Sequence, residues 1–251
     1  LPLKVMPSLL QSRYIPNHKT INMKLILATA LLAIAGCNSA DKAENASMPG
    51  TYKMLSQSVK GAKVDTTYTG LQQLKMYSDD YMMYAHFTTA DSVSAFGIGS
   101  YSVSKDTVTE NVVYNANDTA KNDMPASFKL AVTKTEKGYK QLISGIQWGD
   151  QQISLTEDYE TVGTATKSPL DGAWKMIKSY SIIGKDTTTG TGTQFKMYGN
   201  GYFIFGNTYS DSAKKNHTGM GYGKFAMTGT NKSKESVMVS TYYEIRGKDV
   251  D

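Results

Sequence analysis

Short stretches in which apolar and polar residues alternate recur along most of the chain. Phe128–Val132 is one of them, and such alternation predicts a strand with one buried and one solvated face. Gln194–Tyr198 and Tyr202–Asn207 flank Gly-Asn-Gly at 199–201, residues that tolerate positive φ and therefore close a tight hairpin. No stretch after Cys37 keeps the 3.6-residue period of an amphipathic helix. The pattern predicts an all-β, antiparallel body.

The pattern differs near the N-terminus, where the uncharged apolar run Leu25–Ala35 follows Met23-Lys24. This run fits the core of a signal peptide and is shorter than the roughly 20 residues that span a bilayer. Small residues then precede Cys37, the only cysteine, in a sequence that resembles the lipobox of bacterial lipoproteins. The resemblance implies that residues 23–36 are cleaved and that Cys37 is lipidated. The alternative is an ordinary secretory signal in which the cysteine has no role.

The lipobox resemblance also predicts where the protein lies. Several acyl chains on Cys37 anchor a protein stably to a membrane. Asn38 is not the Asp that tends to retain such proteins at the inner membrane, so we expect the outer membrane of the cell envelope. Residues 37–47 are small and polar and predict a flexible tether. Residues 1–22 precede the signal, show no period, and are interpreted as upstream sequence outside the fold.

Charge and cysteine content narrow the classes of partner. The chain has 27 Lys and Arg against 22 Asp and Glu. Four of the basic residues and none of the acidic ones precede Cys37, so residues 37–251 hold 23 basic and 22 acidic side chains. Such a balance lacks the basic footprint of a nucleic-acid-binding protein. A single cysteine excludes an internal disulfide framework and a thiolate-rich metal site.

Comparing the chain with itself reveals four matched segments in the same order, at offsets between 121 and 124 residues. The matches are Gly50–Met54 with Gly172–Met176, Gln73–Tyr77 with Gln194–Tyr198, Tyr81–Tyr84 with Tyr202–Phe205, and Gly97–Gly99 with Gly221–Gly223. The period is too long for a solenoid repeat and predicts two copies of one domain. We place the copies at 48–162 and 170–251, with a linker at 163–169.

The first match carries a family resemblance. Gly172-x-Trp174 is similar to the Gly-x-Trp start of lipocalins, and Gly50-x-Tyr52 is its aromatic variant. With the aromatic hairpin, the Gly-x-Gly strand and the late Thr156-Glu157 strand, the pattern resembles the tandem lipocalin-like domains of Bacteroidetes-type lipoproteins. The resemblance implies two tandem antiparallel lipocalin-like β-barrels after an N-terminal signal helix, with the aromatic residue plugging the closed end of each barrel.

The second copy is shorter than the first. Glu110 matches Glu235, so Asp251 aligns near Ala126, and nothing corresponds to Ser127–Glu160. We therefore expect the second barrel to be incomplete and the natural chain to continue. A rival alignment makes Thr241–Glu244 the closing strand of a reduced second barrel.

Catalytic chemistry is not indicated. Among the histidines, His86 lies in a predicted strand as a satisfied or exposed side chain, and His217 is expected in a solvated loop tip. Glu157 and its acidic neighbours alternate between two faces and are interpreted as a solvated strand end. No metal-ligand spacing, nucleophile elbow or phosphate loop occurs. We predict no enzyme, no metal and no cofactor beyond the lipid on Cys37.

Aromatic and methionine side chains are the remaining candidates for a binding site, because they form an adaptable apolar lining. The predicted ligand-binding residues are Tyr52, Tyr77, Tyr81, Met83, Tyr84, Trp174, Tyr198, Tyr202 and Phe205. The alternative is that they fill solid barrels. The leading hypothesis is an envelope lipoprotein that binds a small apolar or amphipathic ligand. The alternatives are a structural or adaptor lipoprotein that binds another envelope protein, and an envelope glycan hydrolase.

Overall fold

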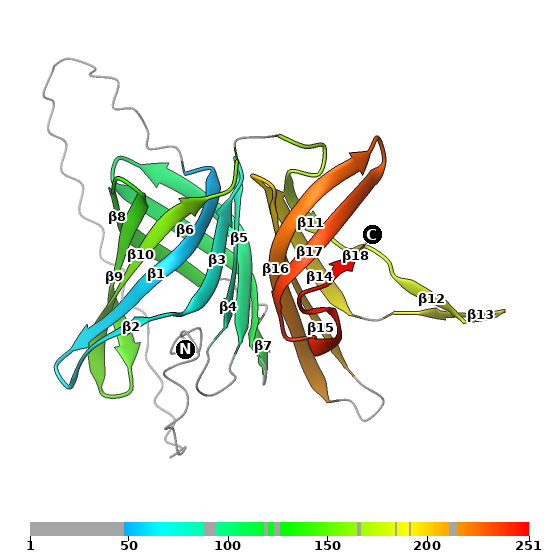
Figure 1. The fold of residues 1–251 in the computed structure, drawn as a ribbon. Coiled ribbons are helices and arrows are strands. Elements are labelled where there is room, and N and C mark those ends of the chain that lie inside the picture. Colours follow the sequence, from blue (N-terminus) through cyan, green and yellow to red (C-terminus); the bar gives the residue numbers. More distant parts are fainter. Residues whose placement is uncertain are drawn as a thin grey trace, which may run out of the picture.

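A computed structural model describes residues 48–87, 94–117, 120–122, 126–164, 167–183, 185–190, 192–210 and 215–250. These residues form a closed β-barrel, a curved sheet beside it and a hairpin that projects away from both (Figure 1). The predicted signal helix, the tether and Cys37 lie outside the described residues.

Eight antiparallel strands close the barrel, because the last of them pairs with the first. They are β1 (Gly50–Gly61), β3 (Gln72–Tyr77), β4 (Tyr81–Phe87), β5 (Ala95–Ser104), β6 (Thr107–Asn117), β8 (Ala126–Lys134), β9 (Gly138–Trp148) and β10 (Gln151–Val162). Two shorter strands lie outside this closed path: β2 (Val64–Thr69) pairs with the second half of β1, and β7 (Ala120–Asn122) pairs with β6. The predicted all-β, antiparallel fold is confirmed for this part of the chain.

The second part forms an open sheet, called sheet B here, instead of the expected second barrel. Its strands are β11 (Gly172–Lys175), β14 (Thr193–Gly199), β15 (Tyr202–Ser210), β16 (Asn216–Gly229), β17 (Lys232–Ser240) and β18 (Asp249–Val250), in that order. Neither β11 nor β18 has a second neighbour among the described strands, so a second barrel is not shown, and the incomplete second barrel expected from the sequence stays a prediction. The hairpin of β12 (Tyr180–Ile183) and β13 (Asp186–Thr189) is separate from sheet B.

The predicted tight turn between β14 and β15 is confirmed, whereas the closing strand predicted near the C-terminus is not formed. Asn200 and Gly201 adopt the positive φ values of 55° and 76° that the tight hairpin between β14 and β15 requires. Thr241–Glu244 is not a closing strand: the chain turns there and forms a short 3-10 helix, η2 (Tyr243–Ile245). The rival alignment is therefore wrong, and β18 pairs with β17 as β8 pairs with β6.

The register of the strand pairs is the same in the barrel and in sheet B. Gly50 pairs with Tyr77 and Tyr52 with Lys75, while Gly172 pairs with Tyr198 and Trp174 with Lys196. The bulge after Ile98 has a counterpart after Tyr222. Residues matched in the sequence therefore occupy equivalent positions in the two sheets.

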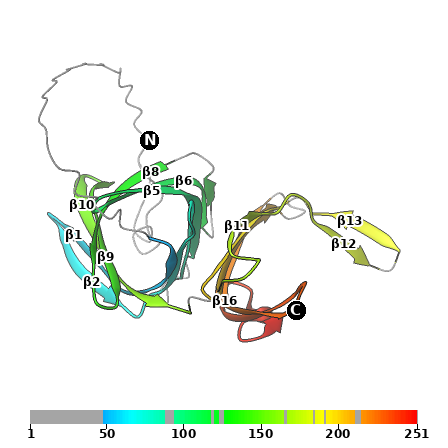
Figure 2. The same ribbon diagram turned by 90° about the horizontal axis from the view of Figure 1, so that it is seen from above.

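An apolar core joins the barrel to sheet B. The outer faces of β3 to β6 contribute side chains that pack against one face of β14 to β16, and Figure 2 shows the convex side of sheet B against the barrel. The buried members are Leu74, Met76, Met83, Ala85, Phe87, Phe96, Ile98, Tyr114, Ala116, Phe195, Met197, Ile204, Met220 and Tyr222. This wall of the barrel is buried on both faces, which explains the nearly continuous burial along β3 and β4.

Candidate binding site inside the barrel

Tyrosine rings plug the end of the barrel where β1 begins, called the plugged end here. Tyr52 lies edge-on to Tyr139 with 4.8 Å between ring centroids, and Tyr77 lies 4.9 Å from Tyr101. The Tyr52 hydroxyl donates to the Met48 carbonyl at 3.2 Å. The aromatic residue of Gly50-x-Tyr52 therefore occupies the plugging position that the family resemblance implies.

Below this plug lies a buried ion pair. Lys75 Nζ on β3 is 2.6 Å from Glu110 Oε1 on β6, and both side chains are almost fully buried. The Tyr77 hydroxyl also donates to Glu110, and Lys75 donates to Gln141 Oε1 on β9 at 3.2 Å. Burial, and then the nearby Glu110 charge, hold the pKa of Tyr77 well above its usual value. A buried pair of this kind depends on such additional hydrogen bonds, because both charges have lost their water.

A second carboxylate, Glu157 on β10, extends the network. It accepts hydrogen bonds from Gln57 at 2.9 Å, from Gln141 at 2.5 Å and from the Tyr159 hydroxyl at 2.8 Å. Gln73 in turn donates to Tyr159. Glu157 is therefore not a solvated strand end, as the sequence predicted, but a buried acceptor.

The network crosses the lumen, because β3 and β9 are not neighbours in the barrel. Its side chains therefore span the middle of the barrel. The interior beyond them, where β4 ends, is the candidate site.

His86 marks that end, called the His86 end here. Its Nδ1 lies 2.7 Å from Gln73 Oε1. The Gln73 amide nitrogen donates a hydrogen bond to Tyr159, so the Gln73 amide oxygen accepts one from His86 Nδ1. The proton of the neutral imidazole is therefore on Nδ1, and His86 Nε2 keeps a lone pair. Nε2 is buried and has no hydrogen-bond partner among the described residues. Burial lowers the pKa of His86 to about 4, so its imidazole is neutral near pH 7.

Asn115 on β6 is separated from His86 on β4 by the strand β5. Its neighbours Tyr114 and Ala116 face sheet B, so alternation places the Asn115 side chain on the inner face. Asn115 pairs with Gly97, and Gly97 pairs with Tyr84 on β4. Asn115 Nδ2 is also buried and has no partner among the described residues. Two unsatisfied polar atoms therefore face the same part of the interior.

Gly97 allows this arrangement. A Cβ atom at Gly97 would lie 2.6 Å from Cε1 of Tyr84, so the Tyr84 ring covers the glycine. The opposite walls carry apolar side chains at the same end, namely Val59, Ile153 and Leu155 with the partly buried Val64, Tyr68, Ile143, Ile146 and Trp148. The His86 end thus combines an apolar wall with a few polar atoms, which is the usual composition of a small-molecule site.

Sheet B carries the same ion pair without the surrounding network. Lys196 Nζ lies 2.7 Å from Glu235 Oε1, and the Tyr198 hydroxyl donates to Glu235 at 2.5 Å. Burial, followed by the hydrogen bond to Glu235, raises the pKa of Tyr198. The exposed fractions of Lys75 and Glu110 are 4% and 6%, whereas those of Lys196 and Glu235 are 30% and 13%. The described strands supply no counterpart of β9 and β10 to cover this pair.

The predicted ligand-binding residues lie in several separate parts of the structure. Tyr52, Tyr77 and Tyr84 point into the barrel, and Tyr198 and Phe205 lie on the concave face of sheet B. Met83 and Tyr202 belong to the core between the barrel and sheet B. Tyr81 is exposed. Trp174 is 50% exposed and donates to the Leu170 carbonyl at 2.7 Å, so it does not plug a closed barrel. The set does not form one site.

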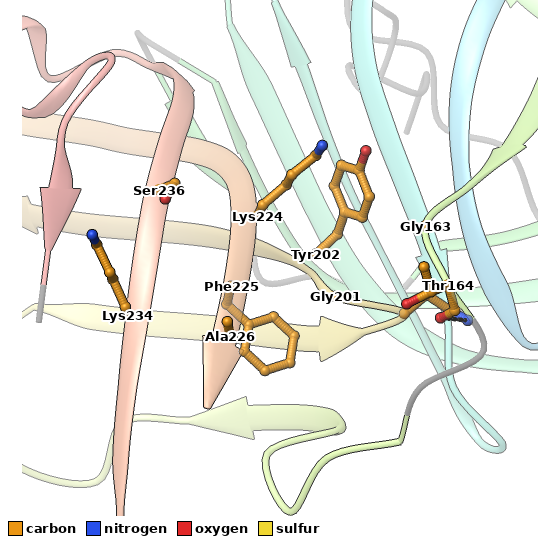
Figure 3. Close-up of a pocket in the computed structure, with 10 residues that line it drawn as sticks. Gly163, Thr164, Gly201, Tyr202, Lys224, Phe225, Ala226, Lys234 and Ser236 are labelled. Carbon is orange, nitrogen blue, oxygen red and sulfur yellow. Dashed lines mark hydrogen bonds between the residues drawn. The ribbon is translucent and has the colours of Figure 1, made fainter. Parts of the chain in front are cut away.

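A groove of about 550 Å³ lies outside the barrel, where the linker meets sheet B (Figure 3). Thr164 of the linker donates to Asn200 at 3.1 Å, and Lys224 lies 5.8 Å from the Tyr202 ring centroid. Lys234, at the opposite wall, is paired with Asp249 at 2.6 Å. The groove is open to solvent, and its lining mixes polar residues with Tyr202, Phe225 and Ala226.

The sequence did not predict the polar interior of the barrel. Lys75, Glu110 and Gln141 each occupy an inward position of an alternating strand, which was the one available signal. His86 was correctly placed in a strand, but only one of its ring nitrogens has a partner. His217 is not in a loop tip: it lies in β16, with its ring stacked 5.2 Å from that of Tyr209.

The comparisons with known proteins assign this chain to no family. No protein-family model matches this chain, and neither a curated protein nor a solved structure matches it. Within the described residues, no helix is long and apolar enough to cross a bilayer. The same residues contain no cluster of His, Cys, Asp and Glu suited to a metal ion.

Proposed function

We propose that this chain is a lipid-anchored, non-enzymatic protein of the cell envelope that holds a small amphipathic molecule in its lipocalin-like barrel. The ligand would lie at the His86 end. The observation that supports this proposal is that two of the three unpartnered buried side-chain atoms among the described residues, His86 Nε2 and Asn115 Nδ2, lie on the inner wall near this end; the third, the Tyr139 hydroxyl, lies in the tyrosine plug. A polar atom that is buried without a hydrogen-bond partner lowers the stability of the folded protein. A bound ligand would supply the missing partner.

The two atoms define the polar group of the ligand. Neutral His86 Nε2 accepts a hydrogen bond, whereas Asn115 Nδ2 donates one. A hydroxyl group satisfies both, because it donates and accepts at the same time. The remainder of the ligand would contact the apolar cluster around Val59 and Leu155. A small alcohol with a hydrocarbon body is therefore the expected ligand class.

Native mass spectrometry after mild extraction tests this proposal directly. We expect a bound mass of ligand size on the wild-type protein, and saturable binding of a fluorescent long-chain alcohol. Asn115→Leu keeps the side-chain volume and removes the donor, so it should weaken probe binding by about fivefold to tenfold. His217→Ala, outside the barrel, is the matched control. Wild-type protein that carries no bound mass and does not bind the probe would disprove the proposal.

The anchor is tested separately. Replacing Cys37 with Ser removes the thiol that would carry the lipid, so the protein should no longer fractionate with membranes. Detergent phase partitioning of the wild-type and variant proteins measures this change. A Cys37→Ser variant that is still processed and still partitions into the detergent phase would contradict lipidation at Cys37.

A further inference from the structure

The edge of β11 with which no described strand pairs corresponds to the edge of β1 that β10 covers in the barrel. Along that edge, Tyr52 pairs with Thr161, Lys53 with Glu160 and Met54 with Tyr159. β11 pairs with β14 on one side and has no second neighbour among the described strands. An unpaired edge presents backbone N–H and C=O groups that can bind another strand.

The residues near this edge are exposed where their barrel counterparts are buried. Tyr52 is 9% exposed and Trp174 is 50% exposed, although both stand at the third position of the Gly-x-aromatic motif. The difference arises because β9 and β10 cover this part of the barrel: the Tyr52 ring packs against Tyr139 of β9, which stacks on Tyr159 of β10. Ile177, just after β11, is 98% exposed, and its counterpart Leu55 is also exposed, at 40%. The β11 edge and its neighbours therefore form an apolar strip that no described strand covers.

The chain after β11 also differs from the matching part of the barrel. β1 continues to Gly61 and pairs with β10 from Thr51 to Gly61, with one bulge between Met54 and Ser56. The matching part of sheet B stops at Lys175, and no strand is formed again before Tyr180. The β12–β13 hairpin then projects away, although Tyr180 pairs with Thr189 just as Ser58 pairs with Thr67. The strand breaks where its pairing partner would be needed.

We propose that the β11 edge binds an extended strand of a partner polypeptide, antiparallel and in the register that β10 uses on β1. The barrel indicates the chemistry of this strand. Tyr159 of β10 faces inward, with its ring 6.0 Å from Lys75 Nζ, and Glu160 faces outward, 3.5 Å from Lys53 Nζ. Lys196 and Lys175 occupy the positions of Lys75 and Lys53. The partner strand is therefore acidic and carries an aromatic residue next to an acid.

This inference goes beyond the proposed function, because the β11 edge lies outside the barrel interior. Either proposal can fail without the other. Binding of the strand would extend β11 toward β12, bury Trp174 and add cover over the Lys196–Glu235 pair. Main-chain hydrogen bonds would provide affinity, and the tyrosine and acid would provide specificity.

Trp174 provides the readout. The full chain with Trp148→Phe leaves Trp174 as its only tryptophan. This protein is titrated with an acetylated peptide of residues 155–163, Leu-Thr-Glu-Asp-Tyr-Glu-Thr-Val-Gly. We expect a saturable blue shift of the Trp174 emission as the indole leaves water. Lys175→Glu should weaken peptide binding by about fivefold, whereas Lys129→Glu, on an exposed position of β8, should not.

Three results would overturn the inference. The first is an emission spectrum that does not change at millimolar peptide. The second is equal binding of a peptide in which the tyrosine is replaced by serine and both glutamates by glutamine, because the recognition would then lack the stated chemistry. The third is a concentration-dependent dimer, seen by sedimentation, in which Trp174 is already shielded without peptide. That result would assign the edge to a second copy of the chain.

Discussion

The barrel and sheet B carry the same inward Lys, Tyr and Glu side chains at the same register, yet they bury them to different extents. Lys75 and Glu110 are enclosed by Gln141 of β9 and by the Glu157–Tyr159 part of the network. Lys196 and Glu235 meet at nearly the same distance without that cover. The comparison shows that the ion pair forms across four consecutive strands, β3 to β6 or β14 to β17, whereas its burial requires the strands that close the barrel.

The largest difference should appear when each glutamate is truncated. Glu110→Ala leaves Lys75 buried without its charge partner, which should lower the free energy of unfolding by about 4 kcal/mol. Glu235→Ala leaves Lys196 partly solvated, so the loss should be about 1 kcal/mol. Urea denaturation of both variants measures the contrast. Equal losses would mean that burial does not distinguish the two pairs.

The aromatic residues of the Gly-x-aromatic motif provide the next contrast. Tyr52→Ala removes a ring packed against Tyr77 and Tyr139, at an expected cost of about 3 kcal/mol. Trp174→Ala removes a half-exposed ring and should cost about 1 kcal/mol. Thermal unfolding followed by circular dichroism tests both values. A larger loss for Trp174→Ala would show that this indole is covered in solution.

The third contrast concerns pH and belongs to the barrel alone. Burial lowers the pKa of His86 to about 4, below the value of an unfolded histidine, so the unfolded chain binds the proton more tightly. The free energy of unfolding is highest above about pH 6.5 and should fall by about 3 kcal/mol as the pH drops to 4. Chemical denaturation at several pH values measures this change. His86→Gln should remove this part of the pH dependence, whereas His217→Gln should retain it.

Particular residues show how far sequence reasoning reached. The Gly-Asn-Gly turn at 199–201 and the strands around Phe128 and Gln194 depend on local φ preferences and on alternation, and both were predicted correctly. The position of Tyr52 at the plugged end followed from the family resemblance. Glu157 was misassigned as solvated because its partners, Gln57 and Gln141, come from two other strands. Met83 was assigned to a ligand lining, but sheet B covers it from outside the barrel.

Strand positions, the tight turn and the residues that match between the two parts of the chain can be read from the amino-acid sequence. These properties depend on a two-residue alternation and on backbone preferences within a few positions. Which matched residues are buried, and which inward polar groups find partners, becomes known only from the folded chain. Those outcomes depend on β9 and β10, which close the barrel but have no counterpart among the described strands beside sheet B.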